Sequence, residues 1–227
     1  MAKAGDAPSP HRSAKPGDNV VLGTYPHRAD GADQTPIKWR VLRNSGTELF
    51  VLSEYIVDCR RYHGEQADIS WHGSDLRKWL NDEFYNAAFD DAEKRIIRTS
   101  LCADNGEGSP DTEDNVFVLS VPEAKQLTDK LAQAPCRVRR RAIGTDYSKR
   151  KTNDGCKLYV YDKQVQDDYV IENGEPMGCS WWWLRTQPDR SPRAYFIGPR
   201  SSIRSYGRVD LACYGVRPAI KIDLSSL

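Results

Sequence analysis

The sequence lacks any long hydrophobic run. No stretch reaches the about 18 apolar residues that a membrane-spanning helix needs, and hydrophobic residues make up only 39% of the chain. The first residues, Met1–Asp6, also lack the apolar core of a signal peptide. We therefore expect no membrane span, and a cytoplasmic protein unless another route exports it.

The sequence also has no large excess of positive or negative charge. Lys and Arg number 33 and Asp and Glu number 32, which leaves a formal net charge of +1 and no global field to attract nucleic acid or a membrane surface. Two basic segments, Arg137–Arg141 and Lys149–Lys151, could contact nucleic acid. The neutral total favours solvated loops instead, so no nucleic-acid partner is expected.

Metal-binding and catalytic motifs are absent as well. The six cysteines form no C-x-x-C pair and have no histidine at a ligand spacing, which argues against a zinc site. They could form three disulfides, but without a signal peptide free thiols are favoured. The four histidines belong to no G-x-S-x-G, H-E-x-x-H or phosphate-loop motif. The sequence therefore predicts no catalytic residue, no cofactor and no metal. The cysteines are Cys59, Cys102, Cys136, Cys156, Cys179 and Cys213.

The hydrophobic patterns that are present indicate an α+β protein. Residues 1–16 show no periodicity and are expected to be a disordered lead-in, with a single domain over 17–227. Ser74 is a candidate helix cap, Asp90 to Glu93 has the spacing of a capping box, and Pro122 suits the first turn of a third helix. Short, mostly antiparallel strands with two or three helices are therefore expected, and residues 101–114 read as a long loop. The predicted strands are 18–25, 37–42, 49–53, 116–120, 158–161 and 169–171.

The last fifth of the chain organises the rest. A triple tryptophan, Trp181–Trp183, and an apolar strand pattern over 216–222 bracket Pro188–Tyr214, which is rich in Arg, Ser, Tyr and Gly. On a strand, the first and third tryptophans share one face and the second takes the other, so a place in the core is favoured over an aromatic ligand cage. Arg185 and Arg217 could bind an anion, but pairing of each with a carboxylate of the framework is the favoured interpretation.

A buried frame around a polar, aromatic-containing loop is typical of a binding face. Tyr offers a rigid contact surface, Arg offers forked donors, and Ser adapts to its partner. Several arginines close together repel one another unless a partner compensates them, so the expected ligand is a protein or other macromolecule with an acidic or aromatic surface. The candidate binding residues are Arg190, Ser191, Arg193, Tyr195, Arg200, Ser201, Ser202, Arg204, Ser205, Tyr206, Arg208, Asp210 and Tyr214.

Five motifs in this order resemble an uncharacterised bacterial family of Trp-rich domains, and the resemblance covers about Gly17 to Leu224. That family looks related to the C-type-lectin-like fold of formylglycine-generating enzymes, where a Trp-containing strand and a closing Gly-x-Arg strand flank ligand-facing loops. Some members of this fold are variable proteins of diversity-generating retroelements, in which a reverse transcriptase rewrites a C-terminal stretch at template adenines. The motifs are Ile37–Leu42, Trp71–Phe89, Arg141–Tyr147, Trp182–Arg185 and Gly215–Ala219.

The composition of Pro188–Val216 agrees with such rewriting. Mutation of the two adenines in an AAC or AAT codon cannot produce Lys, Glu, Gln, Met or Trp. These five types make up 37 of the 227 residues, so about five are expected among 29, and this window contains none. The sequence therefore predicts a non-enzymatic ligand-binding protein with a variable C-terminal surface. The alternatives are an oxidase-related enzyme that uses Cys213 or another thiol, and a tethering module of a larger cytoplasmic system.

Overall fold

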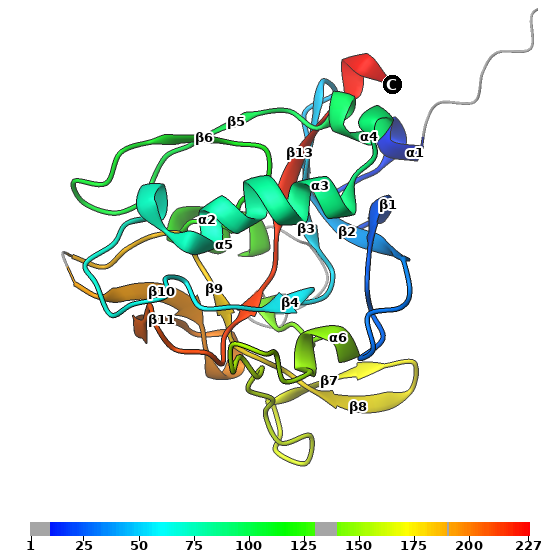
Figure 1. Cartoon of the computed structure of the whole chain (residues 1–227). Helices are drawn as coiled ribbons and strands as arrows, with labels where there is room; N and C mark the ends of the chain where they lie inside the picture. Colours follow the sequence, from blue (N-terminus) through cyan, green and yellow to red (C-terminus); the bar gives the residue numbers. More distant parts are fainter. Residues whose placement is uncertain (1–9, 130–139, 190) are drawn as a thin grey trace, which may run out of the picture.

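The chain folds around two main β-sheets and a small set of short helices, an α+β arrangement with mostly antiparallel strands (Figure 1). This computed structural model describes residues 10–129, 140–189 and 191–227. The described part contains six α-helical segments rather than two or three, several of them a single turn. None of these described helices has the length and apolar character needed to cross a bilayer.

The first sheet joins the start of the domain to its end, in the order β1-β2-β3-β13. The predicted hairpin is confirmed, because β2 and β3 pair antiparallel and the apolar members of Ile37–Leu42 alternate into the core. The last strand, β13, lies against β3 with Ile220 opposite Val51. The strands are β1 (Asn19–Tyr25), β2 (Thr35–Asn44), β3 (Glu48–Ser53) and β13 (Ala219–Asp223).

The second sheet is built mainly from the last fifth of the chain, in the order β11-β10-β9-β12-β4. Its one parallel pair is β12 with β9, which seats Gly215 beside Trp182. The strands are β4 (Asp58–Cys59), β9 (Trp182–Trp183), β10 (Arg193–Ile197), β11 (Ile203–Arg208) and β12 (Gly215–Val216). Two separate hairpins are β5 (Ser100–Cys102) with β6 (Thr112–Asp114) and β7 (Tyr169–Glu172) with β8 (Glu175–Gly178).

The helices begin where the sequence places their caps. Ser74 accepts a hydrogen bond from the Arg77 amide and starts a helix that runs on through a π-helical turn. The full capping box predicted at Asp90 and Glu93 is present. The elements are α1 (Pro10–Ser13), η1 (Trp71–Gly73), α2 (Asp75–Trp79), the π-helical turn η2 (Leu80–Phe84), α3 (Tyr85–Ala88), α4 (Asp91–Ile96), α5 (Val121–Asp129), α6 (Asp146–Lys149), η4 (Pro199–Ser201) and η5 (Leu224–Ser226).

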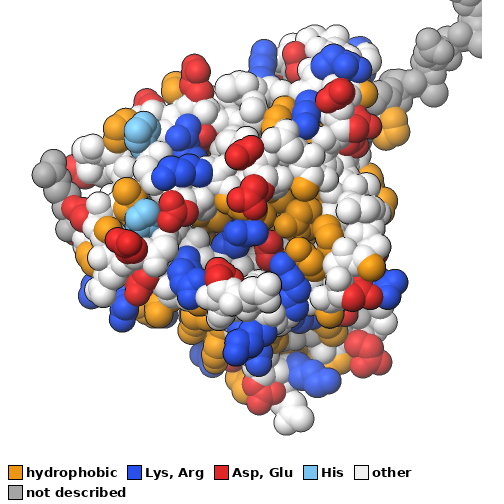
Figure 2. All heavy atoms as spheres, in the orientation of Figure 1, with side chains coloured by type: hydrophobic (Ala, Val, Ile, Leu, Met, Phe, Trp, Pro, Cys, Tyr) orange, Lys and Arg blue, Asp and Glu red, His pale blue; other side chains and the backbone are white. Residues whose placement is uncertain are grey.

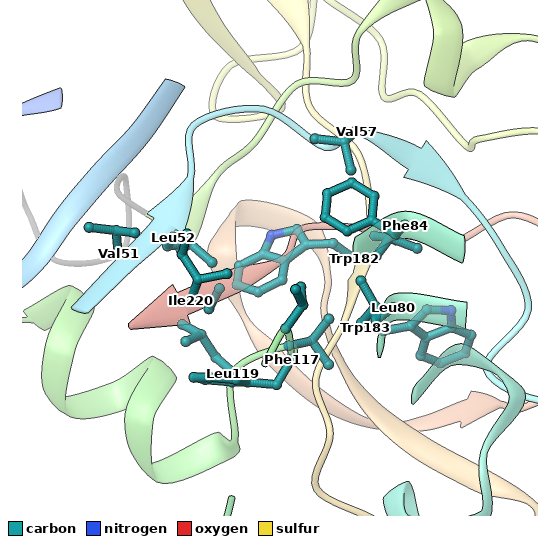
Figure 3. Close-up of a cluster of buried hydrophobic side chains, with 14 of the residues drawn as sticks. Val51, Leu52, Val57, Leu80, Phe84, Phe117, Leu119, Trp182, Trp183 and Ile220 are labelled. Carbon is teal, nitrogen blue, oxygen red and sulfur yellow. The ribbon is translucent and has the colours of Figure 1, made fainter. Parts of the chain in front are cut away.

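Trp182 fills the space between both sheets and the helix. Figure 3 shows its indole among Leu52 and Ile220 of the first sheet, with Leu80 and Phe84 of the helix on its other side. Its ring nitrogen is buried but donates to the carbonyl of Arg140 at 3.0 Å. The Trp182 side chain thus has a hydrogen-bond partner for its ring nitrogen and packs against both sheets and the helix.

Figure 2 shows basic and acidic side chains intermingled over the visible face, with an apolar hollow in its middle, over β4 and between α3 and α6. A buried carboxylate, Asp58, lies on β4 and pairs with Arg150 at 3.2 Å and with Arg60 at 3.5 Å. It also accepts a hydrogen bond from the hydroxyl of Tyr25 at 3.1 Å. The basic segment around Arg150 is therefore a structural contact rather than a solvated loop.

Three sequence expectations need correction. Residues 10–14 of the expected disordered lead-in have defined contacts, since α1 forms there and the Asn44 amide donates to the carbonyl of Ala14. Residues 116–120 and 158–161 form only isolated bridges, which pair Phe117 with Ala219 and Val160 with Ser180. The expected long loop over 101–114 carries the β5–β6 hairpin. Residues 1–9 of the predicted lead-in and Arg137–Arg139 of the basic segment lie outside the described residues.

Candidate protein-binding surface

The stretch Pro188–Tyr214 is mostly a β-hairpin, which corrects its prediction as a polar loop. Strands β10 and β11 pair antiparallel, with a bulge between Ala194 and Phe196. Both of these side chains are buried. A Cβ on Gly207 would lie 2.8 Å from the ring of Trp183, so the glycine lets the hairpin approach the core closely. The hairpin therefore packs against the core without the continuous apolar run that usually identifies a buried strand in a sequence.

The hairpin sorts the predicted binding residues by exposure. The exposed group lies mainly on β11, the outer strand of the sheet, so its side chains are open to a partner. The exposed residues are Arg193, Arg200, Arg204, Ser205, Tyr206 and Arg208, the partly buried ones are Ser191, Tyr195, Ser202 and Asp210, and the buried ones are Ser201 and Tyr214. Arg190 lies outside the described residues.

Tyr214 and Ser201, which the sequence predicts as ligand contacts, are both buried in the structure. The Tyr214 ring is 4% exposed and lies between Trp181, at 5.2 Å, and Trp183, at 4.0 Å between ring centroids. Burial raises its pKa, so it stays a neutral phenol. Ser201 is buried with a left-handed backbone, φ 65°, and its carbonyl accepts a hydrogen bond from Arg140. These two positions hold the hairpin in place.

Tyr195 faces the opposite side of the sheet from Phe196. It lines a cavity of about 470 Å³ together with Thr186 and Val121 at the start of α5. Its backbone also bridges to the neighbouring segment, donating to the carbonyl of Thr186 at 3.0 Å. The structure therefore separates Tyr195 from the exposed residues of β11.

A column of four stacked rings runs from the surface into the core beside this hairpin. Tyr159, which is 42% exposed, stacks on Trp181 with 4.2 Å between centroids and 11° between planes. Trp181 in turn stacks on Tyr214, which stacks on Trp183. Trp181 and Trp183 thus both contact Tyr214 on one face of the strand, as its two-residue period predicts, while the side chain of Trp182 points to the opposite face.

Two further tyrosines widen the exposed end of the column. Tyr206 on β11 is 55% exposed and meets the edge of Phe196 at 5.4 Å. Tyr161 meets Trp181 edge-on at 5.9 Å and accepts a hydrogen bond from its indole nitrogen. We call Tyr159, Tyr161, Trp181 and Tyr206 the aromatic surface. Buried rings support it from below, so its exposed rings are held rigidly.

The arginines beside the aromatic surface differ in whether a carboxylate lies close enough to balance their charge. Arg208 pairs with Asp210 at 2.6 Å, and this hydrogen bond lowers the pKa of the aspartate. Arg200 lies 3.9 Å from Asp168. Arg204 lies opposite Phe196 in the ladder and donates to Ser202 at 3.0 Å, with no carboxylate partner among the residues the structure describes. Its charge is therefore available to a ligand next to the rings.

The frame behind the surface contains one fully neutralised arginine. Both terminal nitrogens of Arg185 donate to the carboxylate of Glu123, and the guanidinium also reaches the carbonyls of Val118 and Ala103. Burial alone would lower the pKa of Arg185, but the carboxylate outweighs it and raises that pKa. The predicted framework role of Arg185 is confirmed. Arg217 differs, because it donates to the backbone carbonyls of Ser53 and Glu54 and, within the described ranges, to no carboxylate.

The Cys213 thiol gives no sign of activation, whereas a hydrogen bond with Cys59 lowers the pKa of the buried Cys156 thiol to about 7. Cys213 is partly buried, and burial followed by the nearby Cys156 raises its pKa, which disfavours the reactive thiolate. The five cysteines that the structure describes are free. Within the described ranges, no group of three or more His, Cys, Asp or Glu side chains is placed to hold a metal ion.

Sequence reasoning missed Tyr159 and Tyr161 as members of the surface. Their segment reads as an alternating strand, which normally buries one face. In the structure only Val160 forms a bridge, to Ser180, and both Tyr159 and Val160 are exposed. The available signal was two tyrosines followed at once by the charged pair Asp162 and Lys163, a pattern that suits an exposed edge better than a core.

The comparisons with known proteins define a family and no activity. Neither the curated proteins nor the solved structures give a match to this chain. Residues 46–224 match a family that is described as a domain of unknown function, and this range includes both the Trp triplet and the β10–β11 hairpin. The chain therefore belongs to the DUF6273 family.

Proposed function

We propose that this protein binds a partner protein through the aromatic surface and the adjoining arginines of β11. The observation that carries the proposal is the ring column, whose outer member Tyr159 is exposed while Tyr214 and Trp183 are buried in the core. The exposed Tyr206 packs beside the column, on Phe196. Rigid aromatic anchors lose little conformational entropy on binding, and Tyr, Trp and Arg dominate the energetics of protein interfaces.

The chemistry of the surface defines the partner it suits. Tyr159 presents its outer face to an aromatic or proline side chain, since Trp181 covers its inner face, and Arg204 adds a forked donor for a carboxylate. A segment that combines an aromatic residue with an acidic one satisfies both groups at once. Nothing in this arrangement requires a metal or a chemical step, so the proposed role is recognition without catalysis.

The fold is proposed to be C-type-lectin-like, with its C-terminal surface diversified by a retroelement. Support for the fold comes from the pairing of the Trp-containing strand β9 with β12, the strand that enters the Gly-Val-Arg motif. Support for diversification comes from the absence of five residue types in Pro188–Val216. Variation is tolerated only where side chains are exposed, because a rewritten core residue would unfold the protein.

Sequencing the DNA on both sides of the coding region tests the diversification proposal. We expect a near-copy of the segment for Trp181 to Ala219 that differs only at adenines, beside a reverse-transcriptase gene. Its differences should fall in codons for exposed positions such as Arg193, Arg204 and Tyr206. Codons for the buried Phe196 should match. Absence of the copy, or differences in the buried codons, would refute diversification and leave the binding proposal standing.

The binding proposal is tested by selecting peptides from a random display library on the wild-type protein. We expect selected peptides to carry aromatic and acidic residues and to lose about tenfold or more in affinity when both Tyr159 and Tyr206 become Ser, because truncated hot-spot residues cost roughly 2 kcal/mol or more. The melting temperature should barely change, since both side chains are exposed.

A matched control is Leu101→Ser, which removes an exposed apolar side chain from β5 on another part of the molecule (Figure 1). It should leave peptide affinity unchanged. Equal affinity of all three proteins for every selected peptide would show that the aromatic surface is not the binding site. The enzyme alternative is checked separately, because a Cys213→Ser variant with full activity on a thiol-containing peptide would exclude a role for that thiol.

A further inference from the structure

A second, half-open site includes Arg217 in its lining and none of the residues of the aromatic surface. A cavity of about 290 Å³ is bounded by the end of β3, by residues 141–143 and by strand β7. Val170, Ile171 and Glu172 of β7 line one side of this space, and Figure 1 shows the β7–β8 hairpin at the lower edge of the molecule. The lining residues are Arg40, Glu54, Tyr55, Arg141, Ala142, Ile143, Val170, Ile171, Glu172 and Arg217.

The floor of the cavity holds a buried cation with an unused donor. Arg217 is 1% exposed, and its Nε and Nη2 atoms donate to the carbonyls of Ser53 and Glu54 at 2.8 and 3.4 Å. Its Nη1 atom is buried and has no hydrogen-bond partner among the described residues. A buried donor left unpaired is costly, and an unpaired buried charge costs more.

The nearby carboxylate does not neutralise this cation fully. Glu54 receives two hydrogen bonds from Arg40, so it is already engaged by a different arginine. Burial lowers the pKa of Arg217 to about 10, and the charge of Glu54 opposes that shift without cancelling it. The floor therefore carries a positive charge for which the described part of the chain supplies no hydrogen-bonded counter-ion.

A second unused donor belongs to Arg141. This side chain is mostly buried and pairs through Nη2 with Asp167 at 2.6 Å, while its Nε atom is buried without a partner in the described structure. Both guanidiniums lie near the thiol of Cys179, whose pKa burial raises to about 11 and the two positive charges partly lower. Two arginines thus approach one region, and each keeps a donor free.

The side walls of the cavity indicate the size and polarity of the rest of the ligand. Ala142, Ile143 and Val170 give an apolar lining, and Ile171, which is 61% exposed, forms the rim. Glu172 at the same end is engaged by the hydroxyl of Tyr55. The volume lies at the lower end for ligand pockets, which suits a small metabolite rather than a peptide.

We propose that this cavity binds a small organic carboxylate with a short apolar body. The carboxylate pairs with the guanidinium groups of Arg217 and Arg141, which both line the cavity, and the apolar body packs against Ile143 and Val170. Charge-assisted donors in a partly buried pocket favour an ionised carboxylate over its neutral amide. This site is independent of the aromatic surface, and it takes a different class of ligand.

Arginine side-chain NMR tests the proposal with a defined probe, 3-methylbutanoate, and its neutral isostere, 3-methylbutanamide. Titration of the uniformly ¹⁵N-labelled protein with the carboxylate should shift the Nε–Hε resonance of Arg141 in a saturable way. The amide should cause no such shift. Absence of a saturable response to the carboxylate up to its solubility, or an equal response to the amide, would overturn the proposal.

Two variants locate the site. Ala142→Leu fills the cavity and leaves both arginines in place, and Arg141→Gln removes one of the free donors. Each should weaken carboxylate binding by about tenfold or more, because the first takes away the space for the ligand and the second takes away a charge-assisted hydrogen bond. Arg193→Gln, a change at an exposed arginine of β10, is the matched control and should bind normally. Undiminished binding by a folded Ala142→Leu protein would place the ligand elsewhere.

Discussion

The two buried arginines Arg185 and Arg217 have hydrogen-bond partners of different kinds. Arg185 has a carboxylate that takes both of its terminal nitrogens, whereas Arg217 has backbone carbonyls, and its charge also lies 5.2 Å from the ring centre of Trp182. A pair of charges in the interior is worth little by itself, but removal of one partner is expensive. The same reasoning applies to Glu54, which holds Arg40 and also lies next to Arg217.

The pH dependence of stability should reveal the Arg40–Glu54 pair. Burial alone would raise the Glu54 pKa, but hydrogen bonds from Arg40 and the charges of Arg217 and Arg40 outweigh it and hold that pKa below its ordinary value of 4.5. A carboxyl with a depressed folded pKa stabilises the protein fully above its unfolded pKa and loses this contribution as pH falls through the folded value. In urea titrations, the wild-type advantage over Glu54→Gln should therefore shrink below about pH 4.5.

A matched variant separates this effect from general acid unfolding. Glu113→Gln changes an exposed carboxyl on β6. The difference in free energy of unfolding between this variant and the wild type should not shrink comparably as pH falls. A Glu54→Gln difference that stayed constant from neutral pH down to pH 3, a range spanning roughly the titration of ordinary carboxyls, would contradict the assigned role of Glu54.

Among the elements, α4 depends on a cap that can be removed cleanly. Asp90 accepts hydrogen bonds from the amides of Ala92 and Glu93, each at 2.8 Å. The Glu93 carboxylate accepts hydrogen bonds from the Asp90 amide and from the Gly23 amide of β1. Asp90→Ala should lower the free energy of unfolding by about 0.5–2 kcal/mol, as measured by urea denaturation. Asp91→Ala in the same first turn should have a smaller effect, and equal losses would show that charge rather than capping is responsible.

Elements with local signals can be predicted from the sequence, and those with distant partners cannot. The caps at Ser74 and Asp90 and the β2–β3 hairpin depend on neighbouring residues, and the sequence predicts all three correctly. The apolar character of residues 116–120 predicts a strand, but only Phe117 pairs, with Ala219 a hundred residues away. The side chain of Asn81 takes over part of the pairing there, because it accepts the amide of Val116 and donates to its carbonyl.

The candidate surface can be predicted only in part, for the same reason. The exposed arginines and Tyr206 belong to one continuous stretch, which composition alone identifies. Tyr159 reaches the surface by stacking on Trp181, a contact that no local pattern encodes. The burial of Tyr214 is likewise hidden from the sequence, because it results from two tryptophans that approach it from another strand.

At the scale of the whole molecule, the first and last strands stabilise one sheet together. β1 pairs with β2 near the start of the domain, and β13 closes the other edge against β3. The closing strand also bonds outside its sheet, since Ala219 exchanges two backbone hydrogen bonds with Phe117, at 2.7 and 3.1 Å. Arg217 of the cavity lies two residues before β13, and β12 connects the β10–β11 hairpin to it, so we expect both candidate sites to depend on this closing strand.

Removal of β13 should therefore unfold the entire domain. The strand buries Ile220 and Ile222, and Leu224 follows in the core. Each side chain contributes roughly 1.5–3 kcal/mol, against a net stability of about 5–15 kcal/mol for a typical domain. A chain ending at Pro218 should show no cooperative thermal transition by calorimetry. Deletion of the exposed residues 225–227 alone should retain that transition. A cooperative transition in the shorter chain would mean that the sheets fold independently, and that β13 is dispensable for the aromatic surface.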